Sequence, residues 1–151
     1  MIDYDVIYED EALRQDAPET LVRSVLDRFA SEILGDGVFS LSFVCAQTMK
    51  ENNLAYRGID DATDILTFAI AQDSDDDFPE IQEEKEWGDI LICTQRMKEN
   101  ASRFGCTDTE ELVRLIIHGL LHLSGLDHET NDFSCEPMLC RQEDLLKTFF
   151  N

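Results

Sequence analysis

The stretch TDTEELVRLIIHGLLHLSGLDH, which spans residues 107–128, decides the fold. Its first four residues, from Thr107 to Glu110, have the capping-box spacing that begins a helix. From Leu112 to Leu123, apolar residues then lie on nearly every side of that helix. A helix that is apolar all round is stable only when other elements surround it. We therefore expect this helix to lie at the centre of the protein.

The same stretch holds all three histidines of the chain within eleven residues. His118 and His122 are four positions apart and project from one face of the helix, so their imidazole nitrogens can meet at one ion. Gly125 can take the positive φ that ends the helix, which brings His128 back from a loop. Three neutral imidazoles with an open fourth position are typical of a catalytic zinc ion, whereas a structural zinc usually has four protein ligands. The spacing therefore predicts one Zn²⁺ per chain, bound by His118, His122 and His128.

The histidine cluster has two competing interpretations. The histidines could be packed core residues, but imidazole nitrogens inside such an apolar helix are costly when nothing pairs with them. The spacing also matches that of the metzincin proteases, HExxHxxGxxH, which need a glutamate beside the first histidine as general base. Gly119 stands in that place and has no proton acceptor, although Asp127 or Glu129 could substitute. Asp127 itself fits two roles equally well, a carboxylate that orients a metal ligand and a turn residue.

Length and composition indicate one domain that covers residues 1–151. With 43% hydrophobic residues the chain can bury a core, and it has no apolar stretch near the ~18 residues that a membrane span needs. We therefore expect no membrane partner. The N-terminus is acidic and the five cysteines form no CxxC pair, so we expect reduced thiols and a cytoplasmic location.

Acidic residues dominate the charge, because 33 acids against 12 bases give a net charge of −21. Such a charge disfavours non-specific binding to DNA or any other polyanion. Nine of the acids fall between Asp73 and Asp89, together with one lysine. Runs of like charge are usually solvated, so we expect an exposed loop outside the functional site. The arginines that could form a local basic groove are Arg96, Arg103, Arg114 and Arg141.

Hydrophobic periodicity predicts an α+β fold built from about four strands and about five helices. The expected strands lie near residues 2–8, 38–45, 65–70 and 88–93. The expected helices cover residues 21–33, 46–57, 94–104 and 107–123, and a last one begins at Pro137. We expect the strands to form one mixed sheet against which the helices pack.

Three motifs resemble those of the YbeY family of rRNA-maturation endoribonucleases. Residues 118–128 match the family's hallmark, HGxLHLxGxDH, at every fixed position. Residues 53–68, NLAYRGIDDATDILTF, resemble its second motif, in which Tyr-Arg precedes TDVLSF. Gly88-Asp-Ile resembles the third motif, which opens a strand, and the similarity extends over about residues 35–150.

The resemblance implies a zincin-like fold with the two-histidine helix at its centre. It also implies a single-strand-specific, metal-dependent endoribonuclease that acts in 16S rRNA 3′-end maturation and ribosome quality control. Its substrate would be an rRNA precursor, and it would associate with the small ribosomal subunit. In that family the residues that match Arg57 and His118 are important for activity. Our candidates for supporting roles are Thr63, Asp64 and Asp127.

Elementary chemistry agrees with a nuclease but leaves other functions open. A metal ion can activate water and stabilise a phosphate oxygen, and Arg57 can donate two hydrogen bonds to a phosphate. Asp64 could equally cap the turn before its strand. The alternatives are a zinc-dependent hydrolase of peptides or small molecules, and a non-enzymatic ribosome-assembly factor in which zinc only holds the fold. A structural zinc would need a fourth protein ligand, for which Cys135 and Asp127 are the nearest candidates.

Overall fold

The computed structural model describes residues 1–70 and 85–151, and in these ranges it contains one four-stranded sheet and six helices. The strands are β1 (Ile2–Tyr8), β2 (Gly37–Val44), β3 (Ile65–Ala69) and β4 (Glu86–Cys93). The helices are α1 (Leu13–Asp16), α2 (Glu19–Leu34), α3 (Ala46–Arg57), α4 (Thr94–Phe104), α5 (Asp108–Leu123) and α6 (Pro137–Phe150). The predicted α+β class with a mixed sheet is confirmed. The additional helix is α1, a single turn that is too short to show a periodicity in the sequence.

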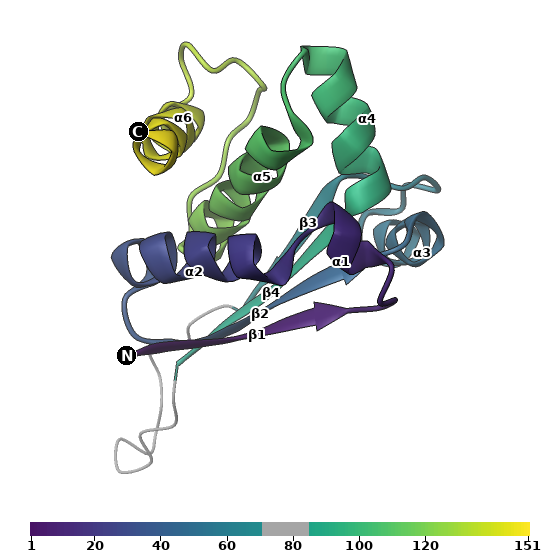
Figure 1. Cartoon of the computed structure of the whole chain (residues 1–151), viewed down its shortest axis with the longest axis horizontal. Helices are drawn as coiled ribbons and strands as arrows, with labels where there is room; N and C mark the ends of the chain where they lie inside the picture. Colours follow the sequence, from purple (N-terminus) through teal and green to yellow (C-terminus); the bar gives the residue numbers. More distant parts are fainter. Residues whose placement is uncertain (71–84) are drawn as a thin grey trace.

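The sheet has the strand order β1-β2-β4-β3, so β3 forms one of its edges. β1, β2 and β4 are parallel, and β3 pairs with β4 in the antiparallel direction. Successive side chains of a strand point to opposite faces. Ile90 and Ile92 of β4 therefore join the large core beneath α2, α4, α5 and α6 (Figure 1). Cys93 joins a smaller core on the other face, together with Met49 of α3.

Helix α5 occupies the centre of this arrangement, between the sheet and α6, and it also contacts α2 and α4 (Figure 1). Its N-terminus is capped as predicted, because Thr107 Oγ1 accepts the N–H of Glu110 at 3.0 Å. Gly119 faces the sheet, where an added Cβ would come 2.9 to 3.2 Å from three side-chain carbons of Ile90. Glycine lets α5 lie this close to β4, so packing explains the residue at position 119.

The acidic segment differs from its prediction at its C-terminal end. Residues 71–84 lie outside the described part of the chain, so the solvated loop predicted for 73–89 can be followed only from Lys85 onward. There the prediction is wrong, because β4 already begins at Glu86. Glu86 lies opposite Val38 of β2, and pairing within the sheet overrides the local run of charge.

The length and apolar character of the helices bear on whether any of them could cross a membrane. Even α5, which is apolar on most sides, has only 16 residues. Within residues 1–70 and 85–151, none of the helices combines the length and the apolar character needed to cross a membrane.

Candidate metal centre

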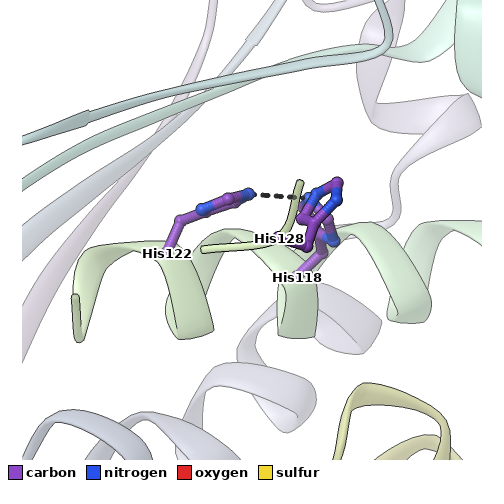
Figure 2. Close-up of side chains that lie close together, drawn as sticks. All are labelled: His118, His122 and His128. Atoms are coloured by element: carbon purple, nitrogen blue, oxygen red, sulfur yellow. Dashed lines mark hydrogen bonds between the residues drawn. The ribbon is translucent and has the colours of Figure 1, made fainter. Parts of the chain in front are cut away.

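Three imidazole rings converge on one side of α5 (Figure 2). His118 and His122 project from successive turns of α5, and His128 reaches the same point from the loop that follows. Gly125 has the predicted positive φ, 105°, and turns the chain just after the helix. The ring centroids lie 4.6 to 5.4 Å apart, and one nitrogen of each ring lies within 4.8 Å of the others. The structure thus brings together the three residues whose spacing predicts a shared site.

The Nδ1 atom of each ring already has a hydrogen-bond partner. These partners are Gln142 Oε1 for His118 at 2.6 Å, the Leu126 carbonyl oxygen for His122 at 3.0 Å, and the Thr130 carbonyl oxygen for His128 at 2.8 Å. All three partners are carbonyl oxygens, which can only accept hydrogen bonds, so each Nδ1 carries a proton and donates it. In the neutral form of each ring, Nε2 is then the nitrogen that keeps a lone pair.

The Nε2 atoms of His118 and His122 face each other at 3.0 Å (Figure 2). Two lone pairs at this distance repel unless a cation lies between them. Zinc–nitrogen bonds of about 2.0–2.1 Å in a tetrahedral site place two nitrogens about 3.3 Å apart, close to the observed separation. In the described ranges no fourth histidine, cysteine or carboxylate joins the group, and this includes Cys135 and Asp127. The donor set fits a transition-metal ion with an open position, and imidazole nitrogen favours zinc over magnesium or calcium.

Burial keeps the first two histidines of the cluster neutral. Desolvation lowers the pKa of His118 to about 4, and the hydrogen bond with Gln142 offsets this only in part. Desolvation also lowers the pKa of His122. Both rings therefore lack the second proton at neutral pH, and the unprotonated imidazole is the form that binds a metal.

The histidines line a cleft of about 1090 Å³ between β3, α5 and α6. The cleft is also lined by the predicted catalytic residue Arg57 and by the three candidates for supporting roles, Thr63, Asp64 and Asp127. Arg57 ends α3 and is exposed, and in the part of the chain that the structure describes no carboxylate pairs with its guanidinium. It is therefore available to bind an anion in the cleft that the three histidines also line.

The four candidate arginines do not form a basic groove beside the histidines. Arg114 lines the cleft, but three carboxylates surround its guanidinium, those of Glu110, Glu111 and Glu143. Arg96 is paired with two other carboxylates, and neither Arg103 nor Arg141 lines the cleft. Among the described residues that line the cleft, Arg57 is thus the only cation without a carboxylate partner. Five acidic side chains line the same cleft, so its walls are more acidic than basic.

Asp64 holds the start of β3 in place. Its carboxylate accepts a hydrogen bond from Asn100 Nδ2 at 3.0 Å and another from Thr63 Oγ1 at 3.3 Å. Its backbone oxygen accepts the N–H of Cys93 at 2.9 Å. Burial raises the pKa of Asp64 above its usual value. These contacts tie the loop before β3 to α4 and β4, so Asp64 supports the strand that forms one wall of the cleft.

Asp127 has the geometry of a turn residue. Its Oδ1 accepts the backbone N–H of His128 at 2.8 Å. The same atom lies 3.9 Å from Nδ1 of His122, which instead donates to the Leu126 carbonyl. Of the two roles considered for Asp127, the geometry favours the turn.

Gln142 is a site residue that sequence reasoning misses. Its side chain is only 2% exposed and lies against His118. The other buried residues of α6 are apolar, namely Met138, Leu139 and Leu146. The sequence does contain a signal for this residue, namely a polar side chain among the apolar positions that an amphipathic helix buries. A buried amide needs hydrogen-bond partners, so such a residue indicates a specific polar contact.

Residues 4–150 match the family model described as Endoribonuclease YbeY. The chain belongs to this family. The curated Endoribonuclease YbeY of Halalkalibacterium halodurans is 36% identical over 154 residues, which cover 98% of this chain and 96% of that protein. The YbeY of Geobacillus thermodenitrificans is 34% identical over 151 residues, again 98% of this chain and 96% of the relative.

A solved structure also resembles this YbeY-family chain. It is the solution structure of a Thermotoga maritima protein, which is 29% identical and gives a TM-score of 0.62. The match covers 97% of this chain and 87% of that one. The similarity therefore extends over nearly the whole chain and includes the region of the histidine cluster.

Proposed function

We propose that residues 1–151 form one Zn²⁺-dependent endoribonuclease domain that cleaves single-stranded RNA. One observation carries the proposal: three imidazole rings converge, each with one nitrogen within 4.8 Å of the others, in a cleft that also contains Arg57, a guanidinium with no carboxylate partner among the described residues. The curated relatives support the reaction class, because they are named endoribonucleases.

Different side chains of the cleft would have different roles in phosphodiester cleavage. His118, His122 and His128 would hold the ion through Nε2. When bound there, zinc supplies Lewis-acid activation of water and of a phosphate oxygen. Arg57 would donate two parallel hydrogen bonds to the phosphate and neutralise the charge that grows on it. Thr63 and Asp64 would support this arrangement by fixing the wall of the cleft, and Asp127 by fixing the turn before His128.

Two exposed aromatic rings support a preference for single strands. Phe104 is 66% exposed and Phe133 is 51% exposed, and both line the cleft that contains the histidines. Unpaired bases can swing out and stack on aromatic side chains, whereas the bases of a duplex are already stacked on each other. Rings of this kind would therefore retain a single-stranded RNA beside the metal.

We place the enzyme in the cytoplasm, where it acts on rRNA precursors in 16S rRNA 3′-end maturation and ribosome quality control. The resemblance of residues 118–128 and 53–68 to the YbeY motifs supports this role. The five cysteines are free, as expected in a reducing compartment. A net charge of −21 gives little attraction for bulk RNA or for DNA, which fits an enzyme brought to its substrate by the small ribosomal subunit.

The geometry gives less support to a metzincin-type peptidase and to a protein in which zinc only holds the fold. A metzincin-type peptidase needs a glutamate at position 119, where Gly119 packs tightly against Ile90. A structural zinc needs a fourth protein ligand, and none joins the three histidines in the described ranges.

A cleavage assay with four matched substrates tests the proposal. They are a labelled single-stranded RNA, the same RNA annealed to its complement, DNA of the same sequence, and an unstructured peptide. We expect only the single-stranded RNA to be cut, with activity lost on chelation and restored by zinc. Cleavage of the peptide instead, or RNA cleavage by protein whose metal content is zero, would overturn the proposal.

A further inference from the structure

The side-chain amide of Gln142 connects the metal centre to an ion pair. Its Oε1 accepts a hydrogen bond from Nδ1 of His118 at 2.6 Å, and its Nε2 donates to Oε2 of Glu143 at 3.1 Å. The side chain is 2% exposed, so water does not compete for these bonds. A buried amide that uses its acceptor on one side and its donor on the other has a single favourable orientation.

Arg114 is the last residue of this series of hydrogen bonds. Its Nε lies 3.0 Å from Oε2 of Glu143 and its Nη2 lies 3.2 Å from Oε1, so the guanidinium donates two hydrogen bonds to the carboxylate. A chain of hydrogen bonds therefore leaves α5 at Arg114, passes through Glu143 and Gln142 on α6, and returns to α5 at His118. Its two ends lie one helical turn apart, so the packing of α6 on α5 fixes the whole chain.

The partners of the other two histidines are of a different kind. His122 and His128 donate their Nδ1 protons to the backbone carbonyls of Leu126 and Thr130. A backbone carbonyl is present whatever side chain the residue carries. Of the three histidines, only His118 donates its Nδ1 proton to a side chain. A substitution of that acceptor side chain can therefore change the tautomer of His118.

We propose that Gln142 is a positioning residue that keeps the proton of His118 on Nδ1 and so directs its Nε2 lone pair at the metal. Without an acceptor at position 142, the proton can move to Nε2, and that tautomer cannot bind the ion through the nitrogen that faces His122. The inference rests on the proposed metal binding, and it adds to that proposal a residue that is itself no ligand. Arg114 and Glu143 act through Gln142, because they fix which end of the amide faces the ring.

Two substitutions at position 142 separate this role from simple packing. Gln142→Met keeps the length of the side chain and removes the acceptor. Gln142→Glu keeps an acceptor but buries a second carboxylate beside Glu143, which is the costlier change for stability. Gln47→Met is the matched control, because Gln47 is exposed on α3 and lies outside the cleft.

Three measurements are made on the wild type and on each variant. Two-bond ¹H–¹⁵N spectra of the zinc-free protein report which ring nitrogen of His118 carries the proton. Competition with a chelator gives the zinc affinity, and thermal unfolding of the zinc-free protein gives its stability. Neither of the first two readouts depends on RNA cleavage.

We expect Gln142→Met to populate the Nε2–H tautomer of His118 and to lose about 10–100-fold in zinc affinity, as when other partners of metal-bound histidines are removed. Gln142→Glu is expected to keep the Nδ1–H tautomer and to bind zinc more tightly than the Met variant, although it unfolds at a lower temperature. Affinity and stability then rank the two variants in opposite orders, which a purely structural role does not produce. Gln47→Met should match the wild type.

An unchanged tautomer and an unchanged zinc affinity in Gln142→Met would overturn the inference. It would also be overturned if zinc affinity and unfolding temperature ranked the two variants in the same order. Should the Met variant fail to fold, the Glu variant decides alone: loss of the Nδ1–H tautomer or of zinc affinity there refutes the role. If the wild type binds no zinc, the proposed metal dependence fails, while the spectra of the zinc-free protein still test Gln142.

Discussion

The Nε2 atoms of His118 and His122 lie 3.0 Å apart with their lone pairs directed at each other. This contact is unfavourable in isolation, because both Nδ1 protons are donated elsewhere and no proton is left to bridge the two atoms. A cation between the rings removes the repulsion. Metal binding and the stability of the folded chain are therefore expected to be coupled.

The first prediction is that one zinc ion per chain stabilises the protein. Zinc that binds only the folded state adds about 2.7 kcal/mol to the free energy of unfolding at 100 times its Kd. Chelation should lower the unfolding temperature and added zinc should restore it, whereas His122→Ala should bind no zinc and show no shift. Elemental analysis and thermal unfolding with and without zinc measure this. A wild-type unfolding temperature that is independent of zinc would contradict it.

The second prediction concerns the buried carboxylate of Asp64. Burial raises its pKa, so the folded state holds the proton more tightly than the unfolded state, where the value is near 3.8. The stability that Asp64 contributes is thus present below pH 3.8 and is lost as the pH rises through the folded-state pKa. Asp64→Asn carries no charge, and it should therefore be more stable than the wild type at pH 7 and about equal to it near pH 3.

Chemical unfolding of the two zinc-free proteins across this pH range measures the difference. Asp5→Asn serves as a control, because Asp5 is exposed on β1. A difference that does not change with pH would show that folding leaves the pKa of Asp64 unchanged, and one that grows toward low pH would show that the folded protein stabilises the anion. Either result would contradict the prediction.

The central helix and its histidines could be predicted from the sequence because they depend on local rules. The cap at Thr107 involves residues three positions apart, and His118 and His122 share a face because of the helical repeat. His128 requires only a turn at Gly125. None of these relationships needs knowledge of another element.

The other parts of the site depend on long-range packing. Arg57, at the end of α3, lines the cleft together with residues of β3 and α5, and sequence spacing alone does not indicate that these elements meet there. Gln142 meets His118 only because α6 packs on α5. Which of the candidate arginines is free to bind an anion depends on packing as well, since the carboxylate of Glu143 that pairs with Arg114 comes from the neighbouring helix α6.

The third prediction is that the exposed rings of the cleft bind bases. Leucine at position 104 or 133 keeps an apolar side chain but removes the flat face, and base–aromatic stacking contributes about 1–3 kcal/mol per base. Phe104→Leu and Phe133→Leu should each weaken single-stranded RNA binding by about 5- to 150-fold. Fluorescence anisotropy of a labelled RNA gives the Kd. Phe150→Leu is the control, because Phe150 is 50% exposed but does not line this cleft, and an equal loss there would refute stacking in the cleft.

The fourth prediction concerns the dependence of RNA binding on salt. Affinity for a single strand falls with a slope of about −0.7 for each phosphate that a cation neutralises. With Arg57 as the only unpaired cation of the described cleft, one or two phosphates are neutralised. Raising salt from 50 to 200 mM should therefore weaken binding only about three- to sevenfold, against about 10³–10⁵ for proteins with many phosphate contacts. A steeper dependence in anisotropy titrations would reveal a basic surface elsewhere.

The fifth prediction tests Arg57 directly. A nuclease needs a fixed cation near its metal, and preorganised donors of this kind are each worth about 10²–10³ in rate. Arg57→Ala should keep the fold and the zinc but lose about this much single-stranded RNA cleavage. Arg57→Lys, which retains the charge without the planar fork, should recover only part of the rate. Cleavage rates, zinc content and thermal unfolding are measured for each variant.

Arg103 supplies the matched control for Arg57. Both arginines are exposed in the last turn of a helix that ends at a glycine in the left-handed conformation, but only Arg57 lines the cleft. Arg103→Ala therefore removes the same charge from the same kind of position and should cleave RNA like the wild type. Equal losses in both alanine variants would mean that general charge, and not a contact with the phosphate, explains the effect. Wild-type cleavage by Arg57→Ala, or a loss that accompanies unfolding or loss of zinc, would remove Arg57 from the catalytic assignment and favour a hydrolase of another substrate.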